Sequence, residues 1–153
     1  MASVFDRITP EGKKFYKEID ELKKLAARVG YQHGDASEED GADIADVAMW
    51  NELGTVHAPA RPFLRQSVDN NESRISSMCR TKLKGIANGT ETAQSVYQAL
   101  GVMQKGLIQQ EILSGDFVPN APATIAKKGS DRPLIDSGRM RQSVNFVIEP
   151  KGS

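Results

Sequence analysis

Two histidines, one cysteine and a short run of carboxylates are the side chains that could take part in chemistry in this chain. His33 and His57 are not spaced as HxH or HxxxH, so neither a strand nor a helix would bring them together around a metal ion. Cys79 is the only cysteine, which excludes an intramolecular disulfide and a multi-thiolate site within one chain. We expect both histidines at surface or loop positions and Cys79 as a small apolar packing residue.

The sequence lacks the motifs of common active sites. It contains no GxSxG, Walker A or GxGxxG segment, so it offers neither a nucleophile elbow nor a phosphate cradle. Glu38, Glu39 and Asp40 lie in a polar loop, whereas a general acid needs burial to raise its pKa. Asp136 precedes Ser137 without a nearby histidine and is better explained as a helix cap. We predict a protein that is not an enzyme and has no cofactor or metal; a small hydrolase or nuclease assembled from distant residues is the alternative from another class.

Five basic residues follow one another near the C-terminus: Lys127, Lys128, Arg132, Arg139 and Arg141. A nucleic-acid-binding protein normally has a basic balance and often interleaved aromatic residues. Here the net charge is zero, the isoelectric point is about 6.7, and no aromatic residue interrupts the stretch. We therefore expect a solvated face or a surface that docks on an acidic protein partner, and no sequence-specific nucleic-acid binding.

The charges are unevenly distributed along the chain. Residues 35–52 contain seven acidic side chains and no Lys or Arg, whereas residues 53–88 contain six basic side chains and two acidic ones. A chain with one acidic and one basic region can attract copies of itself head to tail. The alternative is two solvated surfaces without a partner.

Length and composition indicate one domain over residues 1–153. The 153 residues are 39% hydrophobic and 26% charged, as in ordinary globular proteins. No apolar run approaches the roughly 18 residues of a membrane span, and residues 1–6 lack the basic start and apolar core of a signal peptide. We expect a cytosolic protein without membrane contact.

The apolar spacing predicts an α+β fold, with several amphipathic helices packed on a small, mostly antiparallel sheet. The predicted helices cover about 10–27, 42–53, 62–86, 90–114 (capped by Thr90) and 137–143. Predicted strands cover 29–33 and 144–149. Residues 116–135 form an irregular loop, with one possible helical turn at 123–127, and a loop of this length is often ordered by a partner.

Two segments resemble a known protein family. The first reads Asn51-Glu52-Leu53-Gly54-Thr55 and continues with Ala58-Pro59-Ala60-Arg61-Pro62-Phe63-Leu64-Arg65. The second runs from Ala121 to Ser130 and continues as Pro133-Leu134-Ile135-Asp136-Ser137-Gly138-Arg139-Met140. In this order they resemble the neck, or tail-completion, proteins of long-tailed bacteriophages. Leu53 stands where an aromatic residue is common in that family, and Ser137 stands where threonine is common.

The resemblance implies a non-enzymatic part of the virion, assembled in the bacterial host cytoplasm. Copies would form a ring, of six or twelve, between the head connector and the tail, and would contact connector, tail-terminator or tail-tube proteins. A tail terminator or a head-closure factor is the alternative within the same pathway.

The residues of both segments also have physical roles. Gly54 should end a helix, Pro59 and Pro62 should stiffen the chain, and Phe63 should anchor the next helix in the core. Arg61 and Arg65 would face a partner's carboxylates, for example the acidic region of a neighbouring copy, or Arg61 would pair with Glu52 within the chain. We expect Asp136 to cap a short helix, and Gly138 either to permit a close backbone approach or to be incidental.

Overall fold

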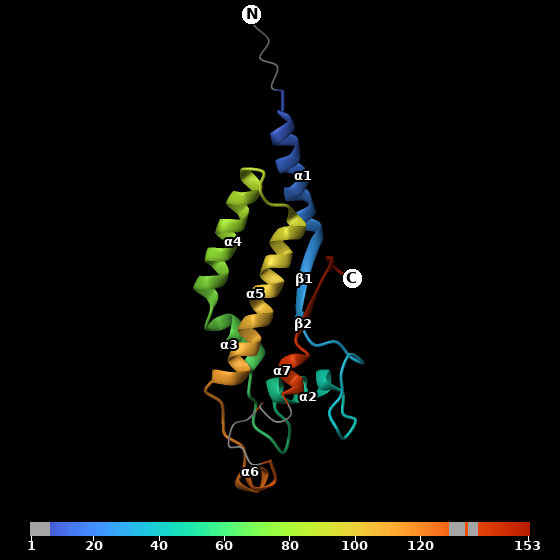
Figure 1. Cartoon of the computed structure of the whole chain (residues 1–153), viewed down its shortest axis with the longest axis vertical. Helices are drawn as coiled ribbons and strands as arrows, with labels where there is room; N and C mark the ends of the chain where they lie inside the picture. The colour runs from blue at the N-terminus through green and yellow to red at the C-terminus, as the bar shows by residue number, and fades with distance from the viewer. Residues whose placement is uncertain (1–6, 129–133, 135–137) are drawn as a thin grey trace, which may run out of the picture.

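The computed structural model describes residues 7–128, 134 and 138–153, and over these residues the chain is α+β, as predicted. The elements, in chain order, are α1 (Pro10–Lys24), β1 (Leu25–Gly30), α2 (Ile44–Leu53), α3 (Phe63–Asp69), α4 (Glu72–Ala87), α5 (Ala93–Ser114), α6 (Pro122–Lys128), α7 (Arg139–Gln142) and β2 (Asn145–Pro150). The molecule is elongated: α1, α4 and α5 run along its long axis, and α2, α6 and α7 lie at the end remote from the N-terminus (Figure 1).

Helix α1 begins as its sequence predicts but ends earlier. The Thr9 side chain accepts a hydrogen bond from the backbone N–H of Gly12 at 3.0 Å, and Pro10 occupies the first turn. The helix stops at Lys24, whereas the apolar spacing predicted about residue 27. Residues 25–30 are extended because they pair with a strand near the C-terminus, and this long-range pairing overrides the helix propensity of Ala26 and Ala27.

The sheet consists of β1 and β2, which pair antiparallel from Leu25↔Pro150 to Gly30↔Asn145. Helix α5 covers one face of it (Figure 1). At Gly101 of α5 a Cβ atom would lie 2.3 Å from the Phe146 ring, so the helix and the sheet can approach this closely only at a glycine.

The predicted helix over 62–86 is two helices in the structure, α3 and α4, with a break at Asn70 and Asn71. The Asn71 side chain donates to the carbonyl of Ser67 at 2.9 Å, and that of Asn70 donates to Glu111 at 3.3 Å. The Asn71 side chain competes with helix continuation by bonding to a nearby carbonyl, and Asn70 at the break is tied to α5.

Helix α5 is the longest helix of the described residues and is capped by Thr92, not by Thr90 as predicted. Thr92 and Ser95 form a capping box: the Thr92 hydroxyl accepts from the N–H of Ser95, and the Ser95 hydroxyl accepts from the N–H of Thr92. Thr90 instead donates its hydroxyl to Asn88 at 2.7 Å.

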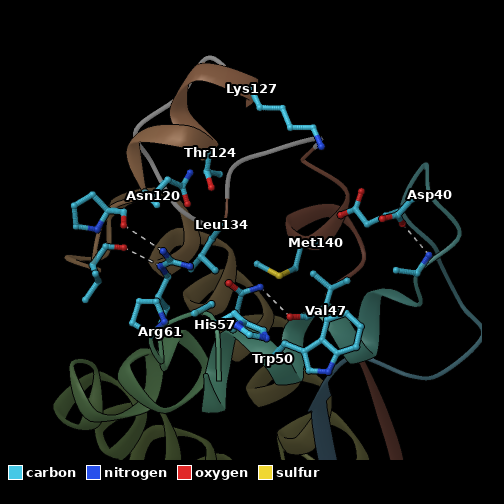
Figure 2. A pocket seen from close by; sticks show the side chains of 18 of the residues that line it. Asp40, Val47, Trp50, His57, Arg61, Asn120, Thr124, Lys127, Leu134 and Met140 are labelled. Atoms are coloured by element: carbon cyan, nitrogen blue, oxygen red, sulfur yellow. Dashed lines mark hydrogen bonds between the residues drawn. The ribbon is translucent and has the colours of Figure 1, made fainter. Parts of the chain in front are cut away.

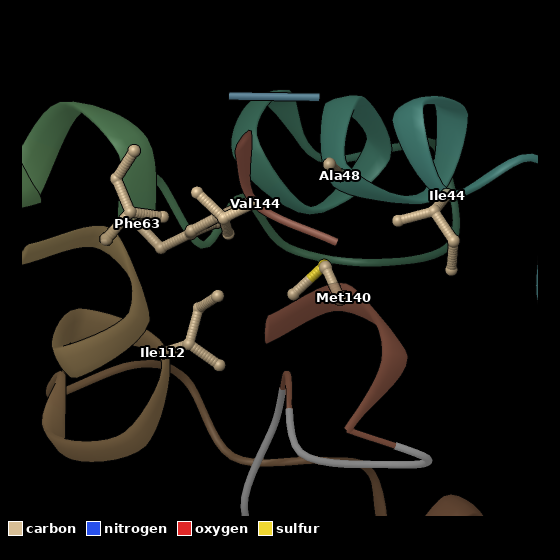
Figure 3. Packing of buried hydrophobic residues seen from close by; sticks show 7 residues of the cluster. Ile44, Ala48, Phe63, Ile112, Met140 and Val144 are labelled. Carbon is tan, nitrogen blue, oxygen red and sulfur yellow. The ribbon is translucent and has the colours of Figure 1, made fainter. Parts of the chain in front are cut away.

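The main core lies where α2, α3, α5 and α7 meet (Figure 3). Its buried members are Ile44, Ala48, Phe63, Ile108, Ile112, Met140 and Val144. They come from four separate stretches of the chain, so residues far apart in sequence are fixed together at this end of the molecule.

The segment predicted to be irregular, 116–135, contains one helix, α6, which is slightly longer than the predicted turn at 123–127. The predicted strand at 144–149 is confirmed with a shift of one residue, whereas the one at 29–33 begins four residues earlier and ends at Gly30. Among the helices in the described ranges, none combines the length and apolar character that crossing a bilayer requires.

Candidate interaction site

The two segments that carry the family resemblance meet around one cavity at the α6 end of the molecule (Figure 2). Its volume is about 1090 Å³. The first segment contributes Asn51, Ala58, Pro59 and Arg61, and the second contributes Ala121, Thr124, Lys127, Leu134, Gly138 and Met140. The acidic loop contributes Glu38, Glu39 and Asp40 along another side. Segments some 60 residues apart in sequence thus form one concave surface.

Helix α2 forms one wall of the cavity and is fixed at its N-terminus by Asp43. The Asp43 carboxylate accepts from the N–H of Gly34 at 2.7 Å and of Ala45 at 2.8 Å. These two hydrogen bonds hold the pKa of Asp43 below its usual value, and His33 lowers it further. The His33 ring lies between two carboxylates, with Nδ1 3.3 Å from Asp43 and Nε2 3.4 Å from Asp46.

Gly54 ends α2 as predicted, with a φ of 77° that favours glycine. A Cβ atom at this position would lie 2.7 Å from the backbone nitrogen of Ala60. The backbone N–H of Thr55 donates a hydrogen bond to the carbonyl of Ala58 at 2.8 Å, so the turn after α2 is compact. Gly54 therefore has two roles, a helix end and a close backbone approach.

Arg61 is an interior residue, which corrects the prediction that it faces a partner. Its side chain is only 9% exposed. Nε donates to the carbonyl of Val118 at 2.8 Å, and Nη2 donates to that of Pro119 at 3.3 Å (Figure 2). Burial lowers the pKa of the guanidinium. Arg61 joins the two segments from inside, since it holds the chain that leads into α6.

Glu52 caps a neighbouring helix and does not pair with Arg61. Its carboxylate accepts from the N–H of Leu64 at 2.8 Å and of Arg65 at 3.2 Å. These are the first free N–H groups of α3, whose own cap position is Pro62 and provides no side-chain hydrogen bond. The side chain of Arg65 is exposed, so it remains available to a partner.

The other predicted basic residues are placed in different ways. Lys127 lines the cavity and points toward the acidic loop in Figure 2. Arg139 contacts that loop within the chain: Nη1 donates to the carbonyl of Ser37 at 2.8 Å, and Nη2 lies 3.8 Å from a Glu39 oxygen. Lys128 belongs to α6, whereas Arg132 and Asp136 lie outside the described residues.

The structure places four of the predicted structural residues as follows. Phe63 is fully buried in the core, and Pro62 immediately precedes α3. Pro59 lies on the cavity wall. Gly138 has a φ of 75° at the start of α7, and a Cβ there would make only an ordinary contact with Gln142 Nε2 at 3.7 Å. The glycine is therefore explained by the left-handed backbone conformation and not by a close backbone approach.

An exposed apolar patch beside the cavity was missed from the sequence. It consists of Met49, Trp50, Leu53 and Val56, with exposed fractions of 48%, 46%, 72% and 97%. A signal was present: α2 has apolar residues on all sides, more than one buried face requires. Contiguous exposed apolar residues on a rigid support are typical of protein-binding surfaces.

The rim of the cavity is chemically mixed. It combines carboxylates, Lys127 and the apolar patch, which suits a polypeptide surface of mixed character. In the described part of the chain, no three His, Cys, Asp or Glu side chains lie together in a way that would hold a metal ion.

Comparison of the chain with protein-family models, with curated proteins and with solved structures gave no match.

Proposed function

We propose that this chain is a structural protein of a tailed bacteriophage virion, a neck or tail-completion component that joins the head connector to the tail. Its partners would be copies of itself in a ring and the adjoining connector, tail-terminator or tail-tube proteins. The activity is binding, and the cavity with its apolar patch would be the contact surface.

The observation that carries this proposal is the joining of the two resemblance segments into one site. Arg61 of the first segment holds the carbonyls of Val118 and Pro119, which lead directly into the second. Phe63 and Met140, one from each segment, share the core beneath the cavity. A pair of motifs that builds one surface is expected when both serve the same partner.

The exposed apolar patch and the charge distribution support a role in assembly. The patch is covered by nothing in the described chain, and covering it would remove an aromatic and several aliphatic side chains from water. The acidic segment 34–43 and the basic helix α4 lie on opposite sides of the molecule (Figure 1). Opposite charges on opposite sides favour head-to-tail contact between copies.

A deletion and complementation experiment tests the proposal. Deleting the gene in the phage or prophage that encodes it should yield filled heads and tails that remain unjoined in electron micrographs. Wild-type protein should restore joined particles and be found at the neck by gold-labelled antibody. Normal infectious particles from the deletion strain, without this protein in their mass spectrum, would refute the proposal; a label at the tail tip would also refute it.

A matched pair of variants tests the contact surface. Leu53→Ser with Val56→Ser removes the most exposed part of the patch, and Leu83→Ser with Val102→Ser removes two exposed apolar residues of α4 and α5 elsewhere. We expect the first double variant to fold but fail to complement the deletion, and the second to complement it. Equal complementation by both would show that the patch is not the contact surface.

A further inference from the structure

The two-stranded sheet has two open edges. No described residue outside β1 and β2 forms a backbone hydrogen bond with the strand positions 26–29 or 146–149. One face of the sheet lies on α5, so the opposite face and the two edges are left uncovered by that helix (Figure 1). Isolated two-stranded sheets are only marginally stable, and unpaired edges are templates for further pairing.

The pairing pattern identifies the backbone groups that point outward. The N–H of Lys151 donates to the carbonyl of Lys24 at 2.7 Å, so these two residues form a hydrogen-bonded pair. In an antiparallel ladder such pairs alternate with non-hydrogen-bonded ones. Given the register, the outward N–H and C=O groups belong to Ala27 and Val29 on β1 and to Phe146 and Ile148 on β2.

Neither edge has the usual protection against pairing. Monomeric proteins block edges with lysine, proline or bulges, but positions 26–29 and 146–149 contain none of these, and Pro150 stands only at the end of β2. The charged residues on the solvent face are Arg28 and Glu149, which form an ion pair with each other. Because Arg28 and Glu149 neutralise each other within the chain, neither edge carries an unpaired charge from these residues that would repel a neighbouring copy.

A second observation lies at the lower end of the strands. A cavity of about 640 Å³ is lined by residues of both strands and by Tyr31 and Gln32. The Tyr31 hydroxyl is buried and forms no hydrogen bond with any described residue. Its burial raises the pKa of the hydroxyl. A buried hydroxyl without a partner is costly, but this one is covered by the chain itself, so the cavity and not the hydroxyl is open to a neighbouring chain.

We infer that β1 of one copy pairs antiparallel with β2 of the next copy, so that the two-stranded sheets join into one continuous sheet around the ring. This inference rests on the proposed function and names its self-contact. The occupant is a second copy because each chain offers two six-residue edges, and a β1-to-β2 contact repeats the antiparallel pairing already present. A closed ring of this kind leaves no strand edge exposed.

Two proline variants separate this contact from the fold. Ala27→Pro removes an outward N–H of β1, and Ile148→Pro removes one of β2; proline is tolerated in an edge strand where its N–H would face solvent. Ile148→Ala controls for the lost side chain. Arg28→Pro, whose N–H points into the ladder, should instead disrupt the pair itself. Circular dichroism reports folding, and native mass spectrometry with sedimentation reports assembly.

Mixing the two variants gives the decisive result. Each should be folded and monomeric alone at concentrations where the wild type and Ile148→Ala assemble. Mixed together, they should form a 1:1 dimer that cannot grow, because Ala27→Pro keeps an intact β2 edge and Ile148→Pro keeps an intact β1 edge. Rings formed by either variant alone, a dimer of Ile148→Pro alone, or a mixture that stays monomeric would each overturn the inference.

Hydrogen exchange on the wild type covers the case in which a proline variant fails to fold. The amides of Ala27, Val29, Phe146 and Ile148 should become protected on assembly, and unchanged exchange would overturn the inference. Failure of this contact is distinguishable from failure of the proposed function. If the protein is found at the neck but assembles without protection of the edge amides, the proposed function stands and the edge contact is refuted. If it pairs through its edges but is absent from particles, the edge contact stands and the proposed function is refuted.

Discussion

The two ends of this elongated molecule differ in the size of their apolar cores, although both contain buried apolar residues. The base, defined as α2, α3, α7 and the C-terminal half of α5, has a core of seven buried apolar residues. The stalk, defined as α1, α4 and the N-terminal half of α5, includes a helix, α1, without any buried residue. Helix α1 is attached by hydrogen bonds: Ala93 N–H to Glu18 at 2.8 Å, Tyr97 hydroxyl to the Leu22 carbonyl at 2.7 Å, and Lys14 to the Gly89 carbonyl at 3.0 Å.

This difference in apolar burial indicates which part of the molecule can open at a low cost in free energy. Burial of apolar side chains contributes several kcal/mol for each large residue, whereas an intramolecular hydrogen bond contributes roughly 0.5–1.5 kcal/mol net. The base therefore fixes the candidate interaction site, and α1 is expected to open locally before the base unfolds.

The largest effect should follow from Phe63→Ala in the base. Phe63 is fully buried, so its truncation removes transferred apolar surface and leaves a cavity. We expect the free energy of unfolding to fall by about 3–5 kcal/mol, measured by urea denaturation. Val68→Ala, on the same helix and 46% exposed, should change it by less than about 1 kcal/mol. Comparable losses for the two variants would contradict the core described for the base.

A smaller effect is expected from Arg61→Met. The variant loses both donors to the carbonyls of Val118 and Pro119, and hydrogen bonds from charged groups contribute about 1.5–3 kcal/mol. Limited proteolysis should cut residues 116–121 faster than in the wild type. Arg65→Met, which changes an exposed arginine four residues further on, should leave both stability and cleavage unchanged. Slow cleavage in Arg61→Met would mean that this loop is held by other contacts.

In the stalk, Tyr97→Phe should have a smaller effect still. It removes the hydroxyl that donates to Leu22 and should lower stability by about 0.5–1.5 kcal/mol. Hydrogen exchange should accelerate in α1 while the amides of α2 and α3 keep their protection. Uniform acceleration across all helices would show that the stalk and the base open as one unit.

The pH dependence of stability provides the finest comparison. Asp43 in the base and Glu91 in the stalk both have a lowered pKa, Asp43 through backbone N–H groups and Glu91 through Lys82 and Ser95. A depressed pKa in the folded state contributes stability above the unfolded value of about 4, and this contribution is lost as pH falls through the folded pKa. Melting temperatures of Asp43→Asn and Glu91→Gln should therefore fall less than that of the wild type below pH 4. Parallel curves for a variant and the wild type would exclude a contribution from that carboxylate.

The sequence was informative wherever one local rule decides the structure. Thr9 and Gly54 bound their helices as predicted, because capping and positive φ depend on neighbouring residues alone. It failed where distant residues decide: Ala26 became part of a strand because of a partner 123 positions away, Glu149. Thr90 was predicted to cap α5, whereas Thr92 caps it by forming a capping box with Ser95.

The candidate site was likewise predictable only in part from the sequence. The two segments were selected from the sequence, but their meeting at one cavity depends on tertiary contacts that no spacing reveals. Arg61 and Glu52 were predicted to bind a partner or to pair with each other, whereas each binds backbone groups of its own chain. An arginine between two prolines gives no sign of whether it points inward or outward.

Trp50 is the only tryptophan of the chain and is 46% exposed within the apolar patch. Its intrinsic fluorescence therefore reports on this one surface without any label. When a partner covers the patch, the emission maximum should move to shorter wavelength and quenching by iodide should decrease. Titration with candidate virion proteins would then give a binding isotherm from the unmodified protein.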